Sequence, residues 1–151
     1  MSSIESLDAL EDVVFIGYPN GIWDTQNYLP IIRRGITATP IMIDFQNAPQ
    51  FLVDASVFPG SSGSPVFLYN TGTYQQKNGA TVVGSRVLFL GVIASVFYRE
   101  DTGRIEMMAV PTAAVPVAVF QQMINLGVVF KARTILEVVE IFISNQQTNY
   151  I

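Results

Sequence analysis

The sequence predicts an all-β protein, an antiparallel barrel or sandwich that ends in a helical segment. About six or seven short runs of β-branched and aromatic residues recur between turn signals as far as Pro111, which is typical of such a fold. After Pro111 the apolar runs are longer and alternate less, which favours helix. Half of the 151 residues are hydrophobic and only 13% are charged, so the chain can bury a core.

Four runs in the first part of the chain are predicted strands, at residues 13–18, 29–39, 41–45 and 50–55. The first run ends at a Pro-Asn-Gly turn. The second is interrupted by Gly35, where we expect a bulge or a sharp bend. After the fourth run, the small residues at 58–64 predict a tight loop.

The remaining predicted strands lie at residues 65–69, within 82–97 and at 105–110. The polar segment 70–80 contains glycine and predicts an exposed hairpin tip or excursion. Glycines break the apolar run 82–97 at Gly84 and Gly91, and a charged turn occupies 99–104. In the tail we expect helices over 115–126 and 135–143, which can cover one end of the barrel.

The chain has neither cysteine nor histidine. Disulfides, thiolate metal sites and cysteine nucleophiles are therefore excluded, and the usual metal ligand and general base are both missing. We expect no metal and no cofactor. A net charge of −4 with scattered cations argues against nucleic acid and anionic membrane partners. No stretch of about 18 apolar residues predicts a membrane span, and the acidic N-terminus does not resemble a signal peptide.

The segment that points most clearly to chemistry is residues 60–66, which read Gly-Ser-Ser-Gly-Ser-Pro-Val. A serine nucleophile needs a loop that exposes its Oγ and directs nearby backbone N–H groups to the position where an oxyanion forms. Gly60 lets the backbone turn an N–H inward, and Gly63 leaves room beside the nucleophile. The alternative is a flexible linker, but linkers are seldom flanked by apolar residues such as Phe58 and Phe67.

This loop resembles the Gly-x-Ser-Gly-Gly/Ser-Pro motif of chymotrypsin-fold serine proteases, and its Ser-Pro-Val-Phe ending is similar to bacterial glutamyl-endopeptidases and trypsin-like peptidases. Further segments follow the order of that family. Residues 15–19 and 34–37 resemble the opening strands of the second barrel of that fold. Residues 90–95 resemble the strand that follows the nucleophile, and residues 108–111 resemble the last strand. The resemblance covers about residues 12–125.

The resemblance implies the second Greek-key barrel of that fold over residues 12–112, with six or seven antiparallel strands. A helical tail over 113–151 would pack on the barrel or on a partner. Ser62 would be the nucleophile, and the backbone N–H groups of Gly60 and Ser62 would form the oxyanion hole. The implied substrate contacts are Ser56 near the base of the primary specificity pocket, Ala109 at its back wall, and Ala94, Ser95 and Val96 along the substrate backbone.

Two departures from the family pattern matter. Ser61 replaces the usual Asp or Asn, so activation through an aspartate paired with a new N-terminus is not expected. The family's His and Asp come from a preceding first barrel, so we expect this chain to be part of a longer enzyme and to be inactive alone. A Ser–Lys dyad would need Lys77 or Lys131, and both are expected to be solvated surface charges.

The sequence thus favours the C-terminal part of a trypsin-like serine endopeptidase that cleaves polypeptides through Ser62. Asp44 and Asp54 are expected to be turn or edge carboxylates, because no histidine is present for them to orient. The alternative function is a non-catalytic domain that binds extended peptides or a partner protein, and a third is an unrelated β-domain. In the two-barrel fold, one face of this barrel packs on the first barrel and is expected to be apolar. That face would be covered by the first barrel, by the tail or by a second copy of the chain in a homodimer.

Overall fold

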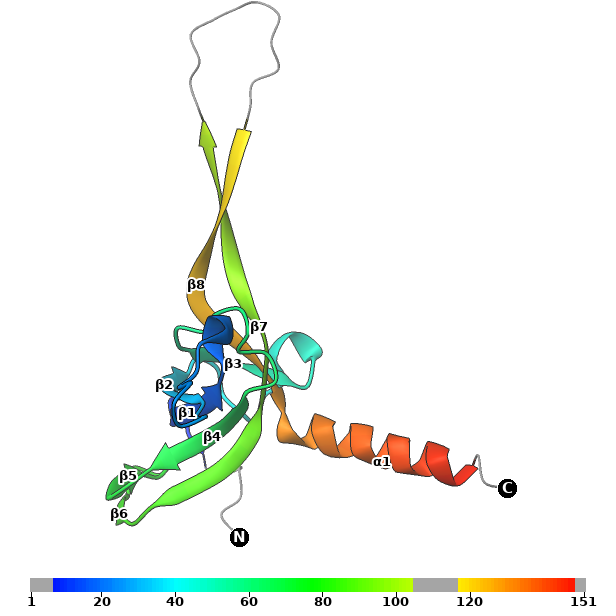
Figure 1. Ribbon diagram of the computed structural model, residues 1–151. Helices are drawn as coiled ribbons and strands as arrows, with labels where there is room; N and C mark the ends of the chain where they lie inside the picture. The colour runs from blue at the N-terminus through cyan, green and yellow to red at the C-terminus, as the bar shows by residue number, and fades with distance from the viewer. Residues whose placement is uncertain (1–6, 105–116, 149–151) are drawn as a thin grey trace, which may run out of the picture.

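The structure, a computed structural model, describes residues 7–104 and 117–148 (Figure 1). Six strands form a closed antiparallel barrel in the order β1-β2-β3-β8-β7-β4. These strands are β1 (Asp12–Gly17), β2 (Ile31–Thr37), β3 (Gln50–Asp54), β4 (Pro65–Asn70), β7 (Arg86–Arg104) and β8 (Val117–Lys131). A separate hairpin joins β5 (Thr73–Gln75) to β6 (Thr81–Val83), and the helix α1 (Ala132–Thr148) follows β8. The predicted all-β barrel with a C-terminal helix is confirmed.

The barrel interior is filled by side chains that alternate with outward-facing ones along each strand. In β1 and β4 the buried positions are two residues apart, as a pleated strand with one buried face requires. The largest fully buried side chains include Phe15 from β1, Phe51 from β3, Leu68 from β4 and Ile93 from β7. Burial of each such side chain contributes about 1.5–3 kcal/mol, so this cluster is the main stabilising element of the barrel.

Beyond the barrel, β7 and β8 continue as a long twisted two-stranded arm, paired from Tyr98↔Met123 to Arg104↔Val117 (Figure 1). The helix expected over 115–126 is therefore wrong for residues 117–126, which are strand. Apolar runs fit either period locally, and the long pairing with β7 decides between them. The barrel also extends past the expected boundary at residue 112, because β8 supplies its last strand.

The segment 41–45 is also not a strand. It forms turns that lead into a short 3₁₀ helix, η3 (Phe45–Asn47), in which Gln46 and Asn47 have positive φ angles of 55° and 58°. The segment is not extended because a turn begins at Pro40, whose carbonyl accepts the Ile43 N–H at 3.2 Å. Another 3₁₀ turn, η2 (Pro19–Gly21), follows β1. The strand expected at 105–110 lies outside the described residues.

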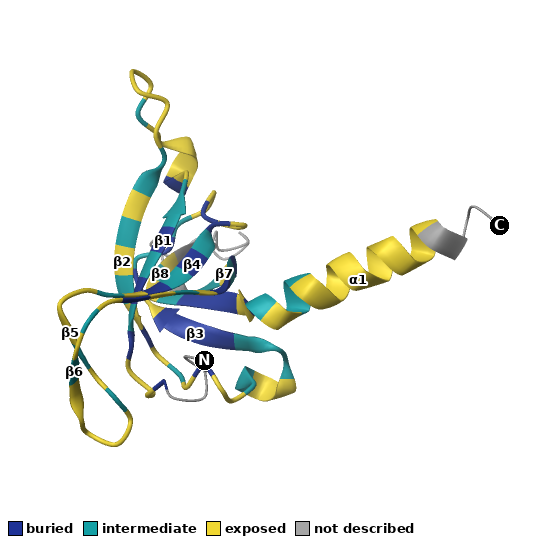
Figure 2. Ribbon diagram, turned by 90° about the horizontal axis from the view of Figure 1, so that it is seen from below, coloured by how far each residue is buried: buried dark blue, intermediate teal, exposed yellow. Residues whose placement is uncertain are grey.

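The helix α1 leaves the barrel at the end of β8 and projects away from it (Figure 2). Its start is fixed by Asp44, whose carboxylate accepts hydrogen bonds from Lys131 (2.6 Å) and from Arg133. The hydrogen bond from Lys131 holds the pKa of Asp44 below its ordinary value. Apolar side chains such as Leu136 and Phe142 remain exposed. Among the described residues, no helix has the length and apolarity needed to cross a membrane.

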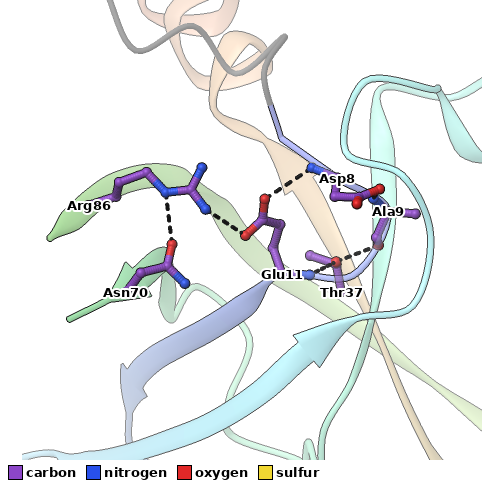
Figure 3. Close-up of polar contacts among 6 residues, drawn as sticks. All are labelled: Asp8, Ala9, Glu11, Thr37, Asn70 and Arg86. Carbon is purple, nitrogen blue, oxygen red and sulfur yellow. Dashed lines mark hydrogen bonds and ion pairs between the residues drawn. The ribbon is translucent and has the colours of Figure 1, made fainter. Parts of the chain in front are cut away.

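The residues before β1 are held to the barrel by a buried polar network (Figure 3). The Arg86 guanidinium of β7 donates to the Glu11 carboxylate at 2.9 Å, and both side chains are almost fully buried. Arg86 also donates to Asn70 of β4 at 3.0 Å and stacks on the Tyr74 ring at 3.9 Å. The other side of the network is Thr37, whose hydroxyl accepts the Glu11 N–H. The network thus connects four parts of the chain that are distant in sequence.

Candidate functional site

The segment 58–64 forms a tight loop between β3 and β4, and two contacts brace its first half. The Arg33 guanidinium of β2 lies over the Phe58 ring at 4.8 Å, which is a cation–π arrangement. The carbonyl of Pro59 accepts the Asn20 N–H at 2.7 Å. The loop is therefore held against β2 and the η2 turn before it reaches Ser62.

Inside the loop, backbone hydrogen bonds set the direction of each serine. The Ser61 N–H donates to the Phe58 carbonyl, and the Ser64 N–H donates to the Ser61 carbonyl, both at 3.0 Å. Gly60 and Gly63 take positive φ angles of 86° and 84°, which side chains with a Cβ rarely adopt. As a result Ser61 points inward and is only 1% exposed, whereas Ser62 is exposed. The buried Ser61 Oγ has no hydrogen-bond partner among the described residues.

The Ser62 hydroxyl contacts one backbone acceptor, and its loop holds two unused backbone donors. Its Oγ donates to the carbonyl of Ala94 on β7 at 3.2 Å. The N–H groups of Gly60 and Ser62 have no acceptor within the described part of the chain. Unused backbone donors in the loop that carries an exposed hydroxyl are the groups that a developing oxyanion would need.

The edge of β7 next to the loop is open. Pairing of β4 with β7 ends at Pro65↔Val92, and Ile93 still exchanges two hydrogen bonds with the loop, through Gly63 and Ser64. From Ala94 onward β7 pairs only with β8 among the described strands. Apart from the Ala94 carbonyl, which accepts the Ser62 hydrogen bond, its other edge can add an extended peptide as a further strand.

A cleft of about 310 Å³ lies between this edge and the loop. It is lined by Val57, Phe58, Pro59, Gly60, Ser62, Ile93, Ala94, Ser95, Val96 and Tyr98. None of these described residues is charged, so the cleft favours an uncharged side chain, because burying an unpaired charge is costly.

The structure brings together most of the site residues that the sequence predicts. Gly60, Ser62, Ala94, Ser95 and Val96 all line the cleft. Ser56 is half-buried just before the loop and does not line the cleft. The predicted back-wall residue, Ala109, lies outside the described residues.

The alternative base Lys131 is not the surface charge that the sequence predicts. Its side chain is buried, and its Nζ donates to the Asp44 carboxylate and to the Ile43 carbonyl at 3.0 Å. The Lys131 ammonium is therefore already committed to an ion pair and cannot take the Ser62 proton.

The other two charged candidates lie at the surface. Lys77 is exposed in the hairpin between β5 and β6. Asp54 is exposed at the end of β3.

No family model matches this chain, no curated protein matches its sequence, and no solved structure matches its fold. The assignment of a function therefore depends on the geometry around Ser62. Within the described ranges, no group of three or more acidic side chains gathers to hold a metal ion.

One feature beside the loop was not predicted from the sequence. The segment 18–29, between β1 and β2, exposes a group of aromatic rings around a hollow of about 520 Å³, lined by Tyr18, Gly21, Trp23 and Tyr28. The aromatic residues recur every five positions, which matches neither a strand nor a helix period, so the pattern gave no signal. Turn residues such as Asp24 and Asn27, which fold this segment back on itself, were the only available indication.

Proposed function

We propose that this chain is the nucleophile-bearing part of a serine endopeptidase of the chymotrypsin type, which binds polypeptides along the open edge of β7 and acts through Ser62. One observation carries the proposal. The exposed Ser62 hydroxyl belongs to a loop with two unused backbone N–H groups, and this loop borders both an unpaired strand edge and an uncharged cleft. A loop that serves only as a linker has no need of this combination.

In the proposed reaction, the Ser62 Oγ attacks the carbonyl carbon of the scissile bond. The new Oγ–C bond forms while the hydroxyl proton passes to a base, and the N–H groups of Gly60 and Ser62 bind the oxyanion. The C–N bond then breaks and the leaving amine takes a proton, so that an acyl-enzyme remains. The chain has no histidine and Lys131 is held by Asp44, so the base would come from outside these residues.

The first prediction is that the chain becomes acylated at Ser62 without turning over at ordinary protease rates. An activated ester of an N-blocked dipeptide ending in valine or leucine suits the uncharged cleft, and millimolar imidazole can replace the missing base. We expect the intact mass to increase by one acyl group, with the adduct on Ser62. Once the imidazole is removed by rapid desalting, no described residue is placed to activate water at Ser62, so the adduct should persist.

Two variants test this assignment. Ser62→Ala should abolish the adduct, whereas Ser85→Ala, which changes an exposed serine in the turn before β7, should leave it unchanged. Labelling that persists in Ser62→Ala, or that spreads equally over exposed serines, would contradict the proposal. Rapid peptide turnover without added imidazole would show that the chain contains its own base.

The second prediction concerns the oxyanion donors. A Cβ on Gly60 would lie 2.8 Å from the Tyr18 carbonyl oxygen, at a φ angle of 86°. Gly60→Ala should therefore displace the Gly60 N–H and slow Ser62 acylation by about 10²-fold. Gly72→Ala is the matched control, because Gly72 has the same φ of 86° and no atom within 4 Å of the added Cβ. Equal acylation rates in both variants would argue against an oxyanion role for Gly60.

A second candidate function is a peptide-binding domain that does not cleave. It is favoured by the hydrogen bond from Ser62 Oγ to the Ala94 carbonyl, which engages the hydroxyl in the absence of a base. The open edge of β7 serves this function equally well. Binding of valine- or leucine-containing peptides that is unaffected by Ser62→Ala, together with no acylation in imidazole, would favour it.

A further inference from the structure

The segment 18–29 is a braced loop. Asp24 and Leu29 form a β-bridge, with the Asp24 N–H donating to the Leu29 carbonyl at 2.9 Å. The Asp24 carboxylate accepts the N–H groups of Gln26 and Asn27 and the Asn27 side-chain amide. The side-chain hydrogen bond from Asn27 is the main reason that the pKa of Asp24 is lowered. Local hydrogen bonds thus fix the loop, although it lies at the surface.

This bracing displays aromatic rings to solvent. Tyr28 is 74% exposed and holds a φ of 60°, an uncommon conformation for a bulky residue. Its ring lies 5.5 Å from that of Trp23, and Tyr18 is also exposed. The three rings surround the hollow of about 520 Å³ that has Gly21 on its wall. A strained, solvent-exposed aromatic group of this kind points to a ligand, because burying the rings would release energy.

The position of the hollow indicates which ligand. The Asn20 N–H bonds to Pro59, and an added Cβ on Gly60 would meet the Tyr18 carbonyl at 2.8 Å and the Gly21 nitrogen at 3.4 Å. Gly60 also lines the cleft that contains Ser62. The aromatic hollow and the cleft are therefore neighbours, because residues that line the hollow lie against Gly60, which lines the cleft. In the proposed complex, the residues before the scissile bond pair with β7 and the scissile carbonyl faces the Gly60 N–H. The residues after that bond would then continue beyond Gly60, towards the aromatic rings.

We propose that the hollow of Tyr18, Gly21, Trp23 and Tyr28 binds the part of the polypeptide substrate that follows the scissile bond, through an aromatic or large aliphatic side chain. This inference rests on the proposed function, because Ser62 defines where the scissile bond lies. The walls supply ring faces and no free charge, since the nearby Asp24 carboxylate is occupied by its own loop. An apolar side chain is the group such a surface recognises.

The experiment uses the single tryptophan of the chain, which is Trp23 in the hollow. Three sets of tryptophan-free peptides are titrated into the 151-residue protein while Trp23 emission is recorded. The first set ends in valine or leucine with a free carboxylate, and so fills only the cleft. The second continues for three residues with phenylalanine at each position in turn. The third has serine in place of phenylalanine.

We expect the second set to shift Trp23 emission to shorter wavelength for at least one phenylalanine position, and to bind about tenfold more tightly than the third set. The first set should leave the emission unchanged. Tyr28→Asn keeps a residue that tolerates positive φ and removes the ring, so it should erase the tenfold preference. Tyr69→Thr, which changes an exposed tyrosine on β4, is the control and should preserve it.

Equal binding of the phenylalanine and serine peptides, or binding of the second set with no change in Trp23 emission, would overturn the inference. The proposed function fails separately. If Ser62 is not acylated while the phenylalanine peptides still shift Trp23 emission, the hollow binds peptide but the catalytic assignment is wrong. If Ser62 is acylated and Trp23 does not respond, the catalytic proposal stands and the hollow has no role in binding.

Discussion

Replacing Arg86 by methionine is expected to lower the free energy of unfolding by about 3–5 kcal/mol, because Glu11 would be left as a buried charge without a partner. The two side chains are only 7% and 6% exposed, so water cannot replace the lost guanidinium. Asn70 would lose its hydrogen bond as well. Urea denaturation followed by circular dichroism measures the change.

The chain contains a matched control for this experiment. Arg34 and Asp12 form an ion pair of the same length, 2.9 Å, but their side chains are 70% and 41% exposed. Arg34→Met should therefore cost less than about 1 kcal/mol. The double variant Glu11→Met with Arg86→Met should recover most of the lost stability, because it removes both buried charges. If Arg86→Met costs no more than Arg34→Met, burial does not strengthen the pair.

Gly91→Ala is expected to destabilise the barrel by about 3 kcal/mol or more, because backbone clashes of this kind are among the few single changes with large effects. An added Cβ would lie 1.9 Å from the Phe130 carbonyl oxygen, at a φ angle of 154°. Gly91 pairs with Val66 on one side and Lys131 on the other, next to a bulge in the β4–β7 ladder. Any shift that relieves the clash would disturb both ladders.

Gly84→Ala is the control for that variant. Its added Cβ would meet only the Tyr74 ring, at 3.9 Å, and its φ is not in the positive range. Its urea midpoint should stay close to that of the unmodified protein. If Gly91→Ala lowers the free energy of unfolding by less than about 1 kcal/mol, the β7–β8 pairing can adjust to the added Cβ, and the prediction is wrong.

The first four barrel strands along the chain were predictable because local residues determine them. Runs of β-branched and aromatic residues mark β1, β2, β3 and β4, and turn residues such as glycine and proline separate them. The helix over 135–143 was also predictable, since Glu137 and Glu140 fall on one side of an otherwise apolar segment. Residues 117–126 were not predictable, because their pairing partner on β7 lies at a distance that no local window contains.

The candidate site follows the same division. Ser62 and Gly60 were found because a short motif contains both and needs only backbone geometry to place them. The Glu11–Arg86 pair could not be found, since the two residues are 75 positions apart and each resembles an ordinary surface charge. The Trp23–Tyr28 pair depends on a positive φ at Tyr28, which a side chain of that size does not suggest.

The closure of the barrel by β8 has a consequence for the order in which the protein can fold during synthesis. β3 is synthesised early. Its partner, the segment Leu126–Phe130 of β8, leaves the ribosome much later. Until then β3 keeps an unpaired edge of buried residues such as Phe51 and Val53, which is a template for pairing with other chains. Slow translation between the two strands would prolong this exposure, whereas a chaperone that covers β3 would shorten it.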